Sequence, residues 1–97
     1  MTFVGLDPGM SGGVAFIHEG RKEPDVYAFG KMTERDMSDL LVNNNPNINL
    51  FAMLESVNAF PGQGISSTWK FGQHYGFLRG VLTAHGIPFE LVRPAKW

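Results

Sequence analysis

The sequence predicts an α/β fold in which two helices pack against a mixed five-stranded sheet. The chain opens with three short apolar segments separated by turn residues, a pattern typical of antiparallel strands joined by hairpins. Two segments with helical spacing of apolar residues follow, and each is followed by a further apolar run of strand length. Hairpins followed by helical crossovers give the order β-β-β-α-β-α-β.

The first three predicted strands are bounded by turn residues. Phe3–Asp7 is a short apolar run that ends in Asp-Pro-Gly, and Gly12–His18 follows so closely that the two form a hairpin. The polar stretch Glu19–Pro24 leads to the third strand, Asp25–Phe29. These segments therefore predict the antiparallel half of the sheet.

A helix is predicted over Glu34–Asn43. Thr33 is its expected N-cap, with Asp36 three residues later as a capping-box partner. Three apolar residues then recur at helical spacing, namely Met37, Leu40 and Leu41. The polar cluster Asn43–Asn49 reads as a loop.

The remaining segments alternate strand and helix. Phe51–Glu55 reads as a buried strand, and Ala59–Gly64 as a flexible loop. Ser66–His85 is the longest predicted helix. It is expected to end at Gly86, with Pro88 just beyond. One apolar face of this helix holds Phe71, Tyr75, Leu78 and Leu82. Phe89–Val92 is the last predicted strand.

Length and composition indicate one small domain, residues 1–97. Hydrophobic residues make up 43% of the chain and charged residues 18%, which favours a packed core over disorder. The chain has no cysteine, no apolar run of membrane-spanning length and no secretory signal, so we expect a cytoplasmic protein. Residues 1–59 carry four basic and eight acidic side chains, a net charge of −4. Residues 60–97 carry four basic side chains and one acidic side chain, a net charge of +3. This difference is compatible with DNA contact or with ordinary scatter of surface charge.

Asp7 is the first candidate for chemistry. It ends an apolar strand, and the chain turns directly after it among glycines, so a hard cation and a phosphate have room there. The alternative is a turn-forming aspartate. Glu55 favours the first interpretation, since it also ends a buried strand. If the two strands are neighbours, the carboxylates meet and repel unless a cation such as Mg²⁺ or a proton intervenes; otherwise Glu55 faces solvent.

Other residues suggest binding roles. Phe60, on the glycine- and proline-rich loop, could stack on an unpaired base or fold into the core. Lys70, Arg79 and Lys96 could contact phosphates or simply be solvated. Helical glycines recur every four residues and predict close packing, either within the chain or in a dimer: Gly72, Gly76 and Gly80. No metal-ligand spacing surrounds the two helical histidines, which we expect at the surface or in a cap: His74 and His85.

Four segments, in order, resemble RuvC-type Holliday-junction resolvases, either phage or bacterial. The first joins VGLDPG at Val4–Gly9 to GGVA at Gly12–Ala15 and resembles the family's opening strand and hairpin. Leu54-Glu55 and the loop with Phe60 resemble its second acidic strand and base-stacking loop. The other two are FGQHYG at Phe71–Gly76 and IPFELVRP at Ile87–Pro94. The resemblance covers nearly the whole chain and implies a ribonuclease H-like fold.

The resemblance also implies a function. Such resolvases are homodimeric phosphodiesterases that use two metal ions, Mg²⁺ or Mn²⁺, on four-way DNA junctions. Asp7 and Glu55 would be two of four metal-binding acids, and Phe60 the stacking residue, although its loop is slightly longer here. The other two acids of the family lie on a C-terminal helix, whereas Glu90 is the only acid after Glu55 in this sequence. We therefore expect the N-terminal part of such an enzyme, either as a fragment of a longer protein or as a naturally truncated relative. Alone, this chain is expected to bind Mg²⁺ weakly and to cleave DNA poorly or not at all.

Three alternatives stay open at this point. An actin-like ATPase or sugar-kinase half would use Leu6–Gly13 as a phosphate-binding hairpin, but it needs a second domain and leaves Glu55 unexplained. A non-catalytic module would bind branched DNA or a protein through the glycine-bearing helix, and Asp7→Asn would leave its function untouched. A non-resolvase nuclease on the same fold is the third.

Overall fold

The computed structural model describes residues 1–42, 49–56 and 64–93. Its strands are β1 (Thr2–Asp7), β2 (Gly13–His18), β3 (Asp25–Ala28), β4 (Leu50–Glu55) and β5 (Phe89–Val92), and its helices are α1 (Glu34–Val42) and α2 (Ile65–Ala84). Every predicted element is confirmed in order and type, with bounds that agree within one residue where they are described. The predicted loops at 43–49 and 59–64 lie almost wholly outside the described residues.

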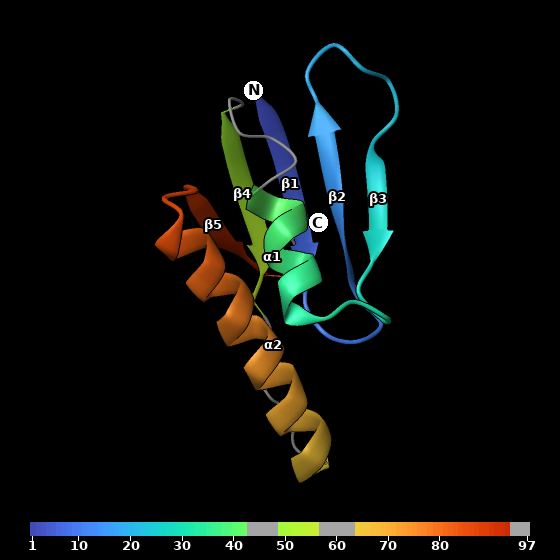
Figure 1. The fold of residues 1–97 in the computed structure, drawn as a ribbon, viewed down its shortest axis with the longest axis vertical. Helices are drawn as coiled ribbons and strands as arrows, with labels where there is room; N and C mark the ends of the chain where they lie inside the picture. The colour runs from blue at the N-terminus through green and yellow to red at the C-terminus, as the bar shows by residue number, and fades with distance from the viewer. Residues whose placement is uncertain (43–48, 57–63, 94–97) are drawn as a thin grey trace.

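The five strands form one mixed sheet in the order β3-β2-β1-β4-β5. β1 pairs antiparallel with β2 and parallel with β4, and β5 extends the parallel part. Figure 1 shows α1 and α2 on the same face of this sheet. The predicted α/β fold with a mixed five-stranded sheet is therefore confirmed.

The core lies between the sheet and the two helices. Alternate residues of the central strands are buried against it, because successive strand side chains point to opposite faces. The strands contribute Val4, Leu6, Val14, Phe16, Ala52 and Leu54, and the helices contribute Met37, Leu41, Leu78, Val81 and Leu82. On the other face of the sheet, Phe3, Ile17 and Val26 are exposed large apolar side chains.

The helix ends follow the chemistry of their caps. The Asp36 side chain accepts a hydrogen bond from the Thr33 N–H at 3.0 Å, and the Thr33 hydroxyl accepts one from the Asp36 N–H at 3.1 Å. The predicted capping box of α1 is thus confirmed. α2 ends where Gly86 takes a φ of +65°, which lets the Ile87 N–H bond the Leu82 carbonyl at 2.9 Å. No helix of the described residues is long and apolar enough to span a membrane.

α2 projects beyond the sheet. Its C-terminal half packs on the strands, whereas its N-terminal half extends past the edge at which β1 and β4 end (Figure 1). The three helical glycines do not pack closely within the described chain, because a Cβ atom on Gly72, Gly76 or Gly80 would meet nothing within 4 Å. Of the two alternatives for these glycines, close packing within the chain is therefore not found among the described residues. The buried side chains of α2 lie on the opposite side of the helix.

Candidate metal centre

The candidate centre lies where two parallel strands end side by side. Leu6 of β1 pairs in register with Leu54 of β4, so the next residue of each strand places a carboxylate at the same edge of the sheet. These carboxylates are Asp7 and Glu55. The structure therefore brings together the two acids that the sequence singled out.

The electrostatics of Glu55 reflect this neighbour. Partial burial raises the pKa of Glu55 above its ordinary value of 4.5, and a hydrogen bond with the Asp7 side chain and the charge of Asp7 raise this pKa further. A carboxylate whose ionisation is disfavoured by a neighbouring carboxylate favours a bound cation or a shared proton. An open pocket of about 370 Å³ adjoins them, lined by Gly5, Leu6, Asp7, Gly13, Val14, Ala15, Val26 and Glu55.

Glycine is required in the turn after Asp7. A Cβ atom on Gly12 would lie 1.9 Å from the Asp7 carbonyl oxygen, and one on Gly13 would lie 2.5 Å from the Tyr27 carbonyl oxygen. Gly9 adopts a φ of +106°, which L side chains rarely take. The Gly12 N–H donates to the Gly9 carbonyl at 3.1 Å and closes the turn. The turn is thereby folded tightly against the main chain of Asp7.

His74 contacts this turn, a contact that the sequence did not predict. The Gly9 N–H donates a hydrogen bond to Nδ1 of His74 at 2.6 Å. The His74 ring also meets Phe29 edge to face, with centroids 4.9 Å apart. Burial lowers the pKa of His74 below 6.5, and the charge of Glu34 opposes that shift. The expected surface or capping role of His74 is therefore wrong, because its helix packs that face against the turn. His85 does sit at the C-cap of α2.

The other predicted binding residues are spread along the chain. Lys70 is exposed on the projecting half of α2. Arg79 is also exposed and lies over the Tyr75 ring, 5.7 Å from its centroid, as a cation–π contact. Phe60 and Lys96 lie outside the described residues.

The two carboxylates have no third acidic partner close to them among the described residues. Glu90 of β5 pairs with Met53 of β4, two positions before the end of β5, and the Glu90 side chain is exposed. In the part of the chain that the structure describes, no group of three or more His, Cys, Asp or Glu side chains could hold a metal ion. Oxygen atoms of Asp7 and Glu55 nevertheless suit a hard divalent cation, which takes carboxylate and water ligands.

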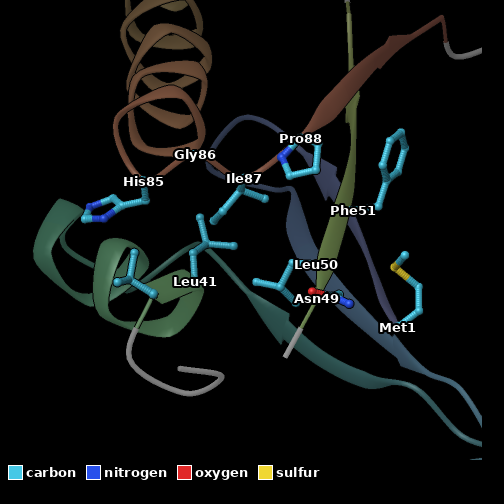
Figure 2. Close-up of a pocket in the computed structure, with 10 residues that line it drawn as sticks. Met1, Leu41, Asn49, Leu50, Phe51, His85, Gly86, Ile87 and Pro88 are labelled. Atoms are coloured by element: carbon cyan, nitrogen blue, oxygen red, sulfur yellow. The ribbon is translucent and has the colours of Figure 1, made fainter. Parts of the chain in front are cut away.

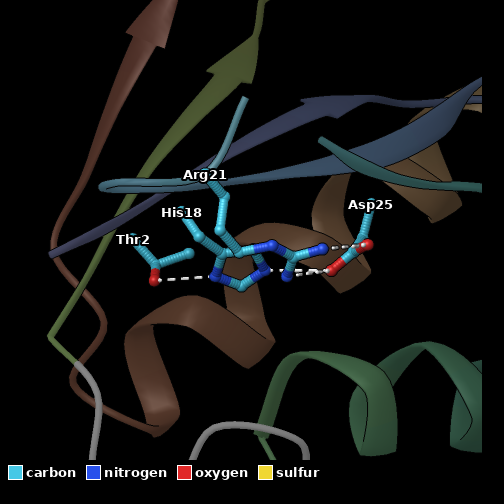
Figure 3. Close-up of polar contacts among 4 residues, drawn as sticks. All are labelled: Thr2, His18, Arg21 and Asp25. Atoms are coloured by element: carbon cyan, nitrogen blue, oxygen red, sulfur yellow. Dashed lines mark hydrogen bonds and ion pairs between the residues drawn. The ribbon is translucent and has the colours of Figure 1, made fainter. Parts of the chain in front are cut away.

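A second polar cluster, of Thr2, His18, Arg21 and Asp25, lies at the end of the sheet opposite to Asp7 and Glu55 (Figure 3). His18 Nε2 lies 3.0 Å from an Asp25 oxygen, and its Nδ1 lies 3.2 Å from the Thr2 hydroxyl. Arg21 donates to both Asp25 oxygens, and it and His18 hold the pKa of Asp25 below its ordinary value of 3.8. The order Thr-His-Asp resembles a nucleophile with its base, but Thr2 is only 2% exposed. A substrate cannot reach that hydroxyl, so the cluster is structural.

A further pocket of about 460 Å³ lies at the edge of the sheet where β4 begins (Figure 2). It is lined by Met1, Leu41, Val42, Asn49, Leu50, Phe51, His85, Gly86, Ile87 and Pro88. It is remote from the carboxylate edge, because Leu50 and Glu55 are at opposite ends of the same strand. It contains no pair of acidic side chains.

Comparisons with known proteins identify the fold. No protein-family model and no curated protein sequence matches the chain. Thermus thermophilus RuvC in complex with a Holliday junction substrate is similar in structure, with a TM-score of 0.67 and 15% identity over 98% of this chain and 66% of that chain. Another T. thermophilus RuvC structure has a TM-score of 0.62 and 16% identity over 97% and 64%. YeaZ from Pseudomonas aeruginosa has a TM-score of 0.50 and 18% identity over 95% and 43%.

At sequence identities this low, the structural similarity establishes the fold alone. The mixed sheet with its two helices matches the ribonuclease H-like architecture of the RuvC structures. The chain spans about two thirds of the length of those RuvC chains.

Proposed function

We propose that this chain belongs to a metal-dependent DNA endonuclease that hydrolyses phosphodiester bonds at four-way junctions. The observation that carries the proposal is the placement of Asp7 and Glu55 at the ends of adjacent parallel strands. The likeness to RuvC in complex with a Holliday junction substrate supports the substrate class. Action on DNA also agrees with the cytoplasmic protein that the cysteine-free sequence predicts.

The chemistry follows from the two carboxylates. Asp7 and Glu55 would hold Mg²⁺ or Mn²⁺, and two ions in a complete site would supply activation of water and stabilisation of the leaving oxygen. Two side chains leave most ligand positions of such ions to water, to the DNA phosphate and to further acids. The residues that the structure does not describe carry no Asp or Glu, so those further acids would come from outside these 97 residues. The 97-residue chain alone would therefore bind metal weakly and cleave poorly or not at all.

The projecting half of α2 is the proposed route for DNA toward the carboxylates. It extends past the sheet edge where Asp7 and Glu55 lie (Figure 1), and it carries exposed Lys70. Lys70, together with Arg79 on the C-terminal half of the same helix, would neutralise phosphates, so binding should weaken as the salt concentration rises. Phe60 and Lys96 remain proposed DNA contacts on sequence grounds.

A homodimer is the proposed assembly. Ile65 is 90% exposed and Trp69 68% exposed on α2. The open glycine positions Gly72, Gly76 and Gly80 continue along the same helix. Two exposed large apolar side chains next to small residues that allow close approach are suited to a second copy of the helix. Two copies would present two cutting sites to the two symmetric strands of a junction.

Cleavage of a labelled four-way junction with Mg²⁺ or Mn²⁺ tests the proposal. The 97-residue chain is compared with a version that is longer at the C-terminus, each with an Asp7→Asn counterpart. We expect paired symmetric cuts from the longer protein and little or none from the short chain, and we expect Asp7→Asn to abolish them. Equal cutting of linear duplex would indicate a general nuclease on this fold. Binding of ATP without any cutting would favour the phosphate-binding hairpin instead.

A further inference from the structure

We infer that His74 is a positioning residue for the carboxylate edge: it holds the turn after Asp7 in place by accepting the backbone hydrogen bond of Gly9. The inference rests on the proposed function, because it gives His74 a role in metal binding only if Asp7 is a metal ligand. His74 touches the turn and not the carboxylate.

The hydrogen bond between the turn and the ring is short. The Gly9 nitrogen and Nδ1 of His74 are 2.6 Å apart, below the usual range for N–H donors. Because a backbone N–H can only donate, Nδ1 must be unprotonated, and the ring proton of the neutral form lies on Nε2. On that side, Nε2 lies 2.9 Å from the Met37 sulfur, a weak acceptor. Both partners therefore select the same tautomer.

The ring is held by parts of the chain that are far apart in sequence. His74 belongs to α2, Met37 to α1, and Phe29 to the segment just after β3. Phe29 and Met37 are both buried. The Phe29 N–H in turn donates a hydrogen bond to the Gly12 carbonyl at 3.0 Å. The cluster therefore contacts the turn at Gly9, through His74, and at Gly12, through Phe29. A ring fixed on three sides defines where Gly9 can lie.

The position of Gly9 bears on the position of Asp7. Only Pro8 separates them, and its fixed φ limits how far one can move without the other. The Phe71 ring lies under Gly9, 3.5 Å from the place where a Cβ atom would stand. Two side chains of α2 thus hold the turn, and the same helix carries Lys70 toward the proposed DNA path. His74 therefore links the geometry of the carboxylate edge to the helix that projects beyond it.

Two measurements on the 97-residue chain test the inference, one by nuclear magnetic resonance and one of metal binding. The first is the through-hydrogen-bond coupling between the Gly9 nitrogen and His74 Nδ1. The second is Mn²⁺ affinity, followed by electron paramagnetic resonance, for the wild type, His74→Asn and His74→Ala. Asn can offer its carbonyl oxygen near the Nδ1 position, whereas Ala offers no acceptor. Met37→Leu is the matched control, because it removes the contact of Nε2 and leaves that of Nδ1.

We expect the coupling in the wild type, unchanged Mn²⁺ affinity in His74→Asn and Met37→Leu, and a loss of about 10-fold in His74→Ala, as for residues that orient metal ligands. Absence of the coupling would overturn the inference even if His74→Ala fails to fold. Mn²⁺ binding that Asp7→Asn abolishes and His74→Ala leaves unchanged would also overturn it, with the metal centre intact. No Mn²⁺ binding by a wild type that shows the coupling would instead overturn the metal centre, and with it the role of His74.

Discussion

Gly12 lies directly against the backbone of Asp7, so closely that a Cβ atom on Gly12 would come within 1.9 Å of the Asp7 carbonyl oxygen. The obstacle is main chain, which cannot rotate away as a flexible side chain can. The place of the first candidate metal ligand thus depends on a glycine on the other side of the hairpin turn.

Gly12→Ala is expected to lower the free energy of unfolding by about 1–3 kcal/mol, the usual range for overpacking. It should also weaken Mn²⁺ binding, because the end of β1 must shift. Urea denaturation and a metal titration measure the two effects. Gly76→Ala, measured at protein concentrations at which the chain is monomeric, is the matched control: its Cβ atom meets nothing within 4 Å, so the helix should gain about 1 kcal/mol. Equal behaviour of the two variants would contradict the close approach.

Glu55→Gln is expected to stabilise the metal-free protein near neutral pH. The folded-state pKa of Glu55 lies above 4.5, so its ionised form destabilises the fold at pH values above that folded pKa. Removing the charge should gain at most about 1 kcal/mol, since the pair is partly solvated. The gain should shrink as pH falls through the pKa of Glu55, and Mn²⁺ binding should be lost at every pH.

Denaturant melts of Glu55→Gln and the wild type across acid and neutral pH test this. Glu90→Gln is the control, because Glu90 is exposed and should change stability by less than about 0.5 kcal/mol. A Glu55→Gln protein that is less stable than the wild type at neutral pH would show that Glu55 makes a favourable contact instead.

His74 should make the stability of the wild type depend on mildly acidic pH. Its folded-state pKa is depressed below 6.5, so its contribution to stability is present above pH 6.5 and is lost as pH falls from there toward the lower folded value. Protonation of Nδ1 would also end the hydrogen bond from Gly9. Glu34 is the charged group that favours the protonated ring and moderates the loss.

Thermal melts of the wild type and His74→Asn over this pH range provide the check. Asparagine does not titrate, so the variant should lose less stability between neutral pH and the folded pKa of His74. Parallel curves for the two proteins would show that another group causes the acid sensitivity.

Trp69→Glu is expected to shift the chain from dimer to monomer, because it places a charge in the exposed apolar part of α2. Analytical ultracentrifugation over a range of protein concentrations measures this. Ile17→Glu is the control, since Ile17 is exposed on the uncovered face of the sheet. If Ile17→Glu dissociates the dimer and Trp69→Glu does not, the sheet face is the interface and α2 is not.

Much of the fold was predictable because its signals are local. Thr33 and Asp36 mark the start of α1, Gly86 marks the end of α2, and alternating apolar residues mark the strands. The pairing of Asp7 with Glu55 was predictable in outline, since two apolar runs that end in acids place both carboxylates at the same edge if the strands are parallel neighbours.

The role of His74 was not predictable in the same way. Its partners Gly9, Phe29 and Met37 lie far from it in the sequence, and their contacts depend on how α2 crosses the sheet. One signal was present: His74 shares a helix face with Leu78 and Val81, both buried. A histidine in an otherwise apolar position is expected to have a hydrogen-bonding partner. The glycine spacing, in contrast, could not tell inward from outward packing.

The parallel pairing of β1 with β4 also determines when during folding the two carboxylates meet. The β1–β2 hairpin joins neighbours in the chain, so it can form within microseconds, like other hairpins. β1 and β4 are separated by β2, β3 and α1, and their pairing must close that long loop at an entropic cost. We therefore expect Asp7 and Glu55 to become adjacent only after the β1–β2 hairpin has formed. A divalent cation that needs both of them should slow unfolding and leave the rate of early hairpin formation unchanged.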